Sequence, residues 1–244
     1  MQKTVLITGA SQGIGWACAK EFLQRTSYNA IVTSRSDNNL SLAKKKLTDI
    51  NIDWSSRIET ITCDQSTHTD IDFLVENLKV FAIQHLIVVA NVGINIAHEM
   101  RARRVQAVSY SILHQTITTN VINTFYLLSK ILALMKKNKC GQIILIGSQA
   151  YKLGIPGQAV YNTSKSALFG LMKTIANEYH SYDIACSLVN PGLVDTERTK
   201  NIQKKIKFSN KHGIALASPE EVARYIVSLT DKKIHDVNGI EFDI

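Results

Sequence analysis

Only three prolines occur in this chain of 244 residues, and no serine-, glycine- or proline-rich tract marks a linker between domains. The four cysteines lie far apart and form no C-x-x-C pair, which argues against disulfides and a cysteine zinc site. No apolar run reaches the roughly 20 residues that span a bilayer, and the N-terminal residues lead directly into a short apolar run. These absences predict one soluble, cytoplasmic domain over residues 1–244, with buried, reduced thiols and no metal site.

The charge is less informative. Lysine and arginine number 28 against 20 acidic residues, and the formal net charge is +8. This balance suits nucleic acid, an anionic cofactor, an acidic partner protein or solubility alone. The basic runs "MRARR" and "KNIQKKIK" contain no aromatic residue that could stack on bases, so we interpret them as a solvated face. Polyanion binding without catalysis is one function that this charge would suit.

Short apolar runs alternate with wider, helical apolar spacing along the chain. The expected strands are residues 4–8, 30–33, 58–62, 86–90, 143–146 and 185–189, with a late strand near 239–242. The expected helices are residues 14–25, 40–50, 71–83, 110–137 and 159–179, and a further helix begins at "ASPEEVA". This alternation predicts a doubly wound parallel sheet of the Rossmann type in three α/β/α layers. Ligands of such sheets bind where the strands end, at their carboxyl ends.

The first expected strand ends in the glycine-rich stretch "TGASQGIG", which leads into the first helix. Glycines there allow a tight turn, let the backbone approach a phosphate and leave helix N–H groups aimed at it. The spacing is G-x-x-x-G-x-G, which differs from the ordinary Rossmann turn and from an ATP-type loop. We expect a pyrophosphate site formed by Gly9, Ser11, Gln12, Gly13, Ile14 and Gly15. A purely structural turn is the alternative.

After the second strand, Ser34 stands where a carboxylate would bind the ribose of NAD, and Arg35 follows it. An arginine there can pair with a 2′-phosphate, which favours NADP(H) over NAD(H). Gln12 supplies no second cation in the glycine loop, so an ordinary surface arginine is the alternative.

Tyr161 and Lys165 in "AVYNTSK" are four residues apart at the start of a helix, so they share one helical face. Ser148 ends the fifth strand thirteen residues earlier, and the intervening loop contains glycines and a proline that could bring hydroxyl and phenol together. A second such pair, Tyr126 and Lys130, lies in an apolar stretch without a comparable serine upstream and is expected to be packed helix.

Carbonyl reduction needs a hydride, which no side chain supplies, so a reduced nicotinamide must provide it. Tyr161 could donate the proton, and the ammonium of Lys165 would lower the pKa of the phenol from its usual value near 10. Ser148 could donate a hydrogen bond to the substrate oxygen and stabilise its developing charge.

Two rival site types fail on spacing. A serine hydrolase needs G-x-S-x-G, but Ile146 and Ala150 occupy the glycine positions around Ser148. A zinc helix needs H-E-x-x-H, but Ala102 occupies the second histidine position after His98.

Taken in order, these motifs resemble the short-chain dehydrogenase/reductase family, of the compact single-domain type, over essentially the whole chain. The resemblance implies that Asp64 in "TCD", with Gln65 beside it, contacts adenine, and that Asn120 in "TTNVINTF" completes the catalytic set with Ser148, Tyr161 and Lys165. It also implies that Lys165 binds the cofactor ribose. Further cofactor contacts implied by "ANVG" and "NPGLVDT" are Asn91, Gly93, Pro191, Gly192, Val194 and Thr196.

Several of these residues have a plain structural alternative. Ser148 could be a strand-end cap, Asp64 an N-cap and Asn120 a solvent-facing polar residue on a helix. The chain also departs from the family's pattern: Ala90 and Val92 replace residues common around N-A-G, and the ending "VNGIEFDI" has no D-G-G.

The substrate is expected to be a small carbonyl or alcohol compound. Gln149, Tyr151 and Leu153 are candidate pocket residues, with loop packing as the alternative, and residues 195–213 are the expected substrate lid. The alternative enzyme hypothesis is a 3-oxoacyl reductase for carrier-bound chains, in which Arg101, Arg103 and Arg104 would contact an acidic carrier. The alternative from another class is a non-catalytic protein that senses NADP(H) or binds a polyanion. The resemblance also implies a homodimer or homotetramer packed through the helices expected at 110–137 and 159–179.

Overall fold

The computed structural model describes residues 3–96, 104–197, 199 and 216–244. Its centre is a seven-stranded sheet in the order β3-β2-β1-β4-β5-β6-β7, in which every neighbouring pair is parallel. The strands are β1 (Lys3–Ile7), β2 (Asn29–Ser34), β3 (Ile58–Thr62), β4 (His85–Ala90), β5 (Gly141–Ile146), β6 (Ile184–Asn190) and β7 (Glu241–Asp243). All seven expected strands form. The inner strands are buried on both faces, as continuous apolar runs in a parallel sheet should be, whereas the edge strands β3 and β7 are partly exposed.

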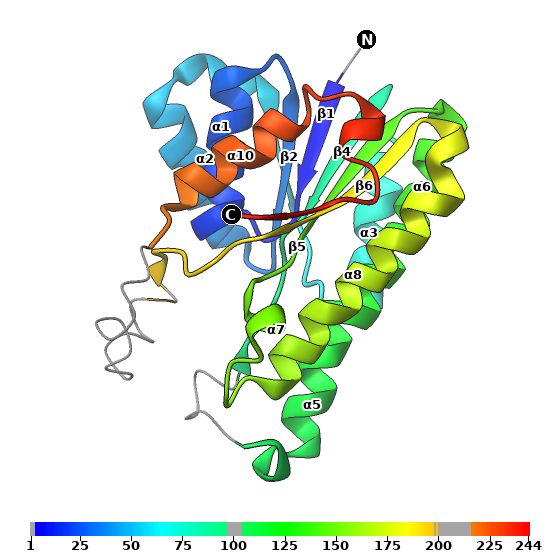
Figure 1. Cartoon of the computed structure of the whole chain (residues 1–244). Helices are drawn as coiled ribbons and strands as arrows, with labels where there is room; N and C mark the ends of the chain where they lie inside the picture. Colours follow the sequence, from blue (N-terminus) through cyan, green and yellow to red (C-terminus); the bar gives the residue numbers. More distant parts are fainter. Residues whose placement is uncertain (1–2, 97–103, 198, 200–215) are drawn as a thin grey trace.

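Helices cover both faces of the sheet, as Figure 1 shows. One face carries α1 (Gly13–Arg25), α2 (Asp37–Ile50) and α10 (Pro219–Leu229); the other carries α3 (His68–Leu78), α6 (Asn123–Asn138) and α8 (Ala159–Tyr179). Adjacent residues of one strand point into different cores: Ile7 packs with Phe22 on the first face, and Leu6 packs with Ile131 on the second. The predicted three-layer Rossmann-type fold is confirmed.

The strand order reverses beside β1, which pairs with both β2 and β4. Val5 is in register with Ala30 on one side and with Ile87 on the other. The glycine-rich turn after β1 and the "ANVG" segment after β4 therefore end next to each other. A crevice at such a switch point is where open α/β sheets bind ligands.

The helix predicted for residues 71–83 is wrong at both ends, since α3 runs from His68 to Leu78. Thr67 caps its start by accepting a hydrogen bond from the backbone N–H of Asp70. Phe81 and Ile83 follow in a turn from which both still pack against the core. Their apolar side chains continued the helical pattern although the backbone had already turned.

The long helix predicted for residues 110–137 has three parts: α5 (Tyr110–Ile117), a π-helical turn η3 (Thr118–Ile122) and α6. The continuous stretch Tyr110–Asn138 is long and apolar enough to cross a membrane by length and composition alone. However, α6 buries Leu127, Ile131 and Met135 against the sheet, which accounts for much of this apolar content.

The remaining short elements include one that the sequence pattern did not predict, α7 (Ala150–Leu153), directly after Ser148. The 3₁₀ turns are η1 (Ile52–Arg57), η2 (Val105–Ala107), η4 (His180–Tyr182) and η5 (Ile234–Asp236). Most of the expected lid at 195–213, together with Arg101, Arg103 and His98, lies outside the described residues.

All four cysteines are free, as predicted. Cys18, Cys63 and Cys186 are buried, and Cys140 is half-buried. Burial raises the pKa of the Cys63 thiol to about 12, so this group stays protonated at neutral pH.

Candidate cofactor and catalytic site

The glycine turn requires glycine for two separate reasons. Gly9 and Gly13 have φ angles of +64° and +57°, in the left-handed region that disfavours other residues. At Gly15 the constraint is space: an added Cβ would lie 2.5 Å from the carbonyl oxygen of Gly9 and 2.9 Å from Cα of Ala10. A side chain would therefore strain the backbone at Gly9 and Gly13 and would collide with the turn at Gly15.

The "ANVG" segment after β4 supports this turn. Asn91 Nδ2 donates hydrogen bonds to the carbonyl oxygens of Thr8, at 3.0 Å, and Gly9, at 3.1 Å. Thr8 Oγ1 accepts hydrogen bonds from the backbone N–H groups of Asn91 and Val92. Asn91 was expected to contact the cofactor directly; its side-chain N–H groups hold the loop instead, and a cofactor contact through its other atoms stays a prediction.

The first helix begins without a side-chain cap at Gln12 and without an acidic residue in its first turn. The helices α2, α3, α5 and α10, in contrast, are capped by Ser36, Thr67, Ser109 and Ser218, while α8 also begins without a side-chain cap. The first N–H groups of a helix have no partner within it, and the helix dipole makes that end attractive to anions. The start of α1 therefore fits a dinucleotide pyrophosphate.

The carboxyl end of β2 lies beside the glycine turn. Ser34 Oγ donates a hydrogen bond of 3.3 Å to Ser11 Oγ, which joins the two segments. Arg35 is exposed, and within the described part of the chain it has no carboxylate partner. A cation is thus available at the strand end where an NAD-binding site would carry an acid.

The residues after β3 have structural partners of their own. Asp64 Oδ1 accepts a hydrogen bond of 2.9 Å from the backbone N–H of Ser66, in the turn that leads into α3. Gln65 is buried and donates a hydrogen bond of 3.1 Å to Thr124 on α6. Their predicted contacts with the cofactor stay predictions, and the side chain of Gln65 is already engaged in the protein interior.

Ser148 follows β5 at the carboxyl edge of the sheet and is partly exposed. Its Oγ accepts a hydrogen bond of 3.2 Å from the backbone N–H of Ala150. A hydroxyl that accepts from the backbone still has its own proton to donate. The serine is thus oriented by α7 and retains the donor that a substrate oxygen would need.

Lys165 lies in the interior of the site, with 3% of its surface exposed. Its Nζ donates a hydrogen bond of 2.6 Å to the carbonyl oxygen of Ile146, at the end of β5. The ammonium also lies 5.8 Å from the ring centroid of Tyr161, one helical turn earlier. Gly93 leaves room for it, because an added Cβ there would lie 2.9 Å from Nζ. The four-residue spacing places Lys165 on the same helical face as Tyr161, and the hydrogen bond to Ile146 holds the ammonium there.

Asn120 joins three parts of the site. It is 1% exposed, so the solvent-facing alternative is wrong. Its side chain accepts from the N–H of Ile94 at 2.8 Å and donates to the Ile94 carbonyl oxygen at 2.9 Å. It also donates to Ser164 Oγ at 2.9 Å, beside Lys165. The π-helical turn thus connects the loop after β4 with α8, which carries Tyr161 and Lys165.

The segment after β6 returns toward the glycine turn. A Cβ added to Gly13 would lie 3.5 Å from Cγ2 of Thr196, so these residues nearly touch. Val194 forms a parallel bridge with Ala217, and Gly192 N–H donates to the carbonyl oxygen of Ile244. Pro191 is buried. This segment lies where it could cover a nicotinamide bound between the glycine turn and Lys165.

Two of the three candidate substrate residues donate hydrogen bonds to the C-terminal segment. Gln149 Nε2 donates to the Ile244 carbonyl oxygen at 3.1 Å, and Tyr151 donates to Glu241 Oε2 at 2.6 Å. Leu153 is 68% exposed. The loop-packing alternative thus describes the observed contacts of Gln149 and Tyr151, and substrate contact by these three residues stays a prediction.

Tyr151 also lines a groove of about 510 Å³ with residues of α8, which are Asn162, Thr163, Ser166, Ala167 and Gly170. Helical periodicity places most of these residues on the side of α8 opposite to Tyr161 and Lys165. This groove therefore lies on the other side of α8 from the candidate catalytic pair.

The second tyrosine–lysine pair is structural, as predicted. Tyr126 donates to Asp72 Oδ1 at 2.8 Å, and Lys130 lies 3.5 Å from the same carboxylate. Asp72 belongs to α3, so the pair connects two helices on one face of the sheet.

The protein-family model described as short chain dehydrogenase matches residues 3–207 of this chain. The chain belongs to the short-chain dehydrogenase/reductase family. It is accordingly an NAD(P)-dependent oxidoreductase that acts on CH–OH or C=O groups.

Similar proteins of this family differ in what their names describe. The 3-oxoacyl-[acyl-carrier-protein] reductase FabG of Salmonella typhimurium is 31% identical, over 97% of this chain and 93% of the relative. The solved structure "ElxO with NADP Bound" is 26% identical with a TM-score of 0.85 and covers 100% of this chain and 97% of that one. The NADPH-dependent reductase YwfH, at 20% identity and a TM-score of 0.87, covers 100% of this chain and 96% of that one and shows the shared fold.

Proposed function

We propose that the protein is an NADPH-dependent carbonyl reductase in which Tyr161 exchanges the proton with the substrate oxygen. The observation that carries this proposal is the buried ammonium of Lys165, hydrogen-bonded to Ile146 and lying one helical turn from Tyr161. Burying a charge is costly unless it is used or compensated. A lysine in this place can favour the phenolate form of Tyr161 and also bind a cofactor ribose.

The chemistry divides among the residues of the site. The reduced nicotinamide supplies the hydride when it is bound. Ser148 donates a hydrogen bond to the substrate oxygen and stabilises charge that develops there. Tyr161 transfers a proton to the same oxygen, and Lys165 assists by favouring the phenolate. Asn120 holds the loop after β4 against α8, so the two sides of the site keep their spacing.

Exposed Arg35 at the end of β2 supports NADP(H), and the structure similar at 26% identity contains NADP. Ser34 in place of an acid leaves space and no negative charge beside a 2′-phosphate. NAD(H) is the competing cofactor.

A 3-oxoacyl reductase for carrier-bound chains is the second candidate. The names of several relatives at about 30% identity favour it. Arg104 is exposed within the described residues and could contact an acidic carrier, but Arg101 and Arg103 fall outside them. Faster turnover of a carrier-bound 3-oxoacyl chain than of small ketones would support this candidate over the general carbonyl substrate.

Assembly into a homodimer or homotetramer in the cytoplasm completes the proposal. Exposed apolar side chains, among them Tyr110, Leu113, Ile122 and Phe125, lie on α5, η3 and α6. Exposed apolar side chains on neighbouring elements suit a subunit interface.

The test is a titration with NADPH and with NADH, followed by the fluorescence of Trp16 and Trp54, in the wild type, Arg35→Ala and the control Lys45→Ala. Lys45 is an exposed cation on α2, so its removal changes the overall charge equally. We expect tighter binding of NADPH, weakened about tenfold or more by Arg35→Ala because a charge-assisted contact is lost. Tighter NADH binding would overturn the cofactor assignment, and no binding of either nucleotide would overturn the proposed reaction.

A further inference from the structure

The backbone on both sides of Ser148 is tied to the segment at the end of β6. Gly147 N–H donates to the Val189 carbonyl oxygen at 2.7 Å, and Gln149 N–H donates to the Pro191 carbonyl oxygen at 3.0 Å. These bonds fix where the serine lies. The direction of the Ser148 side chain depends on α7, because the backbone N–H of Ala150 donates a hydrogen bond to Ser148 Oγ.

The short helix α7 has too few residues to be stable alone, since isolated helices need about 12 to 15 residues. Its side chains contact the acidic strand β7. Lys152 Nζ donates to Glu241 Oε1 at 2.7 Å and to Asp243 Oδ2 at 2.9 Å, while Tyr151 donates to the other oxygen of Glu241. One ammonium and one phenol thereby join α7 to two carboxylates.

Asn190 closes this network on the inner side. It is fully buried, and its Nδ2 donates to Asp243 Oδ1 at 3.1 Å. Its Oδ1 faces Gly147 so closely that an added Cβ on the glycine would lie 2.0 Å away. The contacts thus run from β7 through Asn190 to the residue that precedes Ser148. We call Tyr151, Lys152, Asn190, Glu241 and Asp243 the C-terminal clamp.

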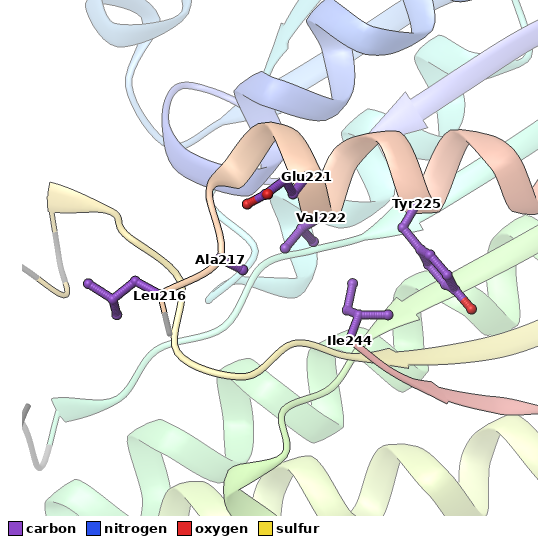
Figure 2. Close-up of a pocket in the computed structure, with 6 residues that line it drawn as sticks. All are labelled: Leu216, Ala217, Glu221, Val222, Tyr225 and Ile244. Atoms are coloured by element: carbon purple, nitrogen blue, oxygen red, sulfur yellow. The ribbon is translucent and has the colours of Figure 1, made fainter. Parts of the chain in front are cut away.

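The strand that carries the two carboxylates is itself anchored. Asn190 and Asp243 are in register between β6 and β7. Beyond the strand, Ile244 points with Val222 and Tyr225 into a pocket of about 300 Å³ beside α10, as Figure 2 shows. Gln149 adds a hydrogen bond to the Ile244 carbonyl oxygen. Ile244 also packs against the hydrophobic core that contains Val222, so the clamp connects the loop of Ser148 to this core.

The clamp is charged at neutral pH. Partial burial alone would raise the pKa of Glu241 and of Asp243, but hydrogen bonds from Lys152, together with one from Tyr151 to Glu241 and one from Asn190 to Asp243, hold both pKa values below their usual values. The hydrogen bond with Glu241 raises the pKa of Lys152. Burial, together with Glu241, raises the pKa of Tyr151 to about 12, so the phenol stays a donor.

We propose that the C-terminal clamp positions Ser148 for the substrate oxygen, with Lys152 as its central positioning residue. No clamp residue needs to touch the substrate for this role. The inference rests on the proposed function, because it assumes that Ser148 acts on the substrate oxygen. It also explains why Gln149 and Tyr151 have their contacts in the C-terminal segment.

The test is a double-mutant cycle between Lys152→Met and Ser148→Ala, with carbonyl turnover and NADPH affinity measured for each variant. If Lys152 acts through Ser148, Lys152→Met lowers kcat about 10- to 100-fold, as misplacing a catalytic group does. In the Ser148→Ala background the same change costs no more than about twofold, because the group that it positions is gone. NADPH affinity stays at the wild-type level in all variants.

Lys152→Arg is the matched control, since a guanidinium can pair with both carboxylates and should restore most of kcat. Glu241→Gln serves if Lys152→Met does not fold, because it removes charge from the clamp but keeps the shape of the side chain. Equal losses of kcat in both backgrounds, or no loss at all, overturn the proposal. If Ser148→Ala itself leaves turnover unchanged while NADPH still binds, the assigned role of Ser148 fails first, and that result is distinct from additivity in the cycle.

Discussion

Tyr161 and Tyr126 are each followed by a lysine four residues later, yet their surroundings differ. Lys165 is buried and bonded to the end of β5, whereas Lys130 lies on the surface beside Asp72. A side chain placed among strand ends can act on a ligand, and one between two helices stabilises their packing. The difference lies in tertiary position and gives each tyrosine a distinct expected phenotype.

Tyr161→Phe is expected to lower kcat for carbonyl reduction by about 10²- to 10⁴-fold, the usual contribution of a general acid. NADPH affinity should change little, because the phenyl ring and Lys165 remain. Steady-state turnover and a binding titration check both. Tyr126→Phe is the matched control and should keep full activity, since its hydroxyl contacts Asp72 and Lys130, which lie outside the candidate site. Equal activity of the two variants would contradict the assignment of Tyr161.

Gly15→Ala should disrupt the cofactor turn, because the new Cβ would lie 2.5 Å from a backbone oxygen that cannot move away cheaply. We expect a lower thermal midpoint and the loss of NADPH binding. The control is Gly170→Ala on α8, where nothing lies within 4 Å of an added Cβ. This variant should bind NADPH normally and gain up to about 1 kcal/mol of helix stability. Normal NADPH binding by Gly15→Ala would show that the turn is looser than its contacts indicate.

At the scale of elements, the helix starts show where sequence signals were strong. The start of α10 has a complete capping box, in which Ser218 accepts from Glu221 N–H and the Glu221 carboxylate accepts from Ser218 N–H. The start of α1 has none. Of these two helix ends, the uncapped one is the one that faces the proposed phosphate site.

Ser218→Ala should destabilise the protein by about 1 kcal/mol at neutral pH, the usual cost of losing such a cap. The hydrogen bonds with Ser218 lower the pKa of Glu221 below its ordinary value. The stabilisation that the ionised Glu221 carboxylate contributes is therefore fully present above the ordinary carboxyl pKa, and it is lost as the pH falls through the lower pKa of the folded state. Urea unfolding at neutral and at acid pH should show the difference between wild type and variant shrinking in acid. A difference that grows in acid would contradict this account.

For the whole molecule, the proposed assembly can be tested through Phe125, which is 57% exposed on α6. Phe125→Glu should place a charge in the subunit interface and shift the protein toward smaller species, with folding intact. Analytical ultracentrifugation measures this shift. Ile52→Glu is the control, because Ile52 is 71% exposed at η1, next to α2 on the other face of the sheet. An unchanged mass for Phe125→Glu would place the interface elsewhere.

Secondary structure was predicted most accurately for the strands, in which buried apolar side chains follow one another directly along the chain. Short apolar runs predicted the inner strands, since a parallel strand between two helical layers is buried on both faces. The prediction was less accurate where a residue kept its apolar contact but left the helix, as Phe81 and Ile83 do after α3. The pattern of burial was correct there, and the backbone conformation was not.

The sequence by itself determined the order of elements, the glycine turn and the spacing of Tyr161 and Lys165, because each depends on neighbours along the chain. Only the tertiary structure decided that Asn91 supports the glycine turn and that Lys152 meets Glu241 and Asp243. Those partners are separated by many residues, and parallel strand pairing brings their ends to one edge of the sheet. Since local propensity carries no information about such distant neighbours, the contacts around the site follow from the fold.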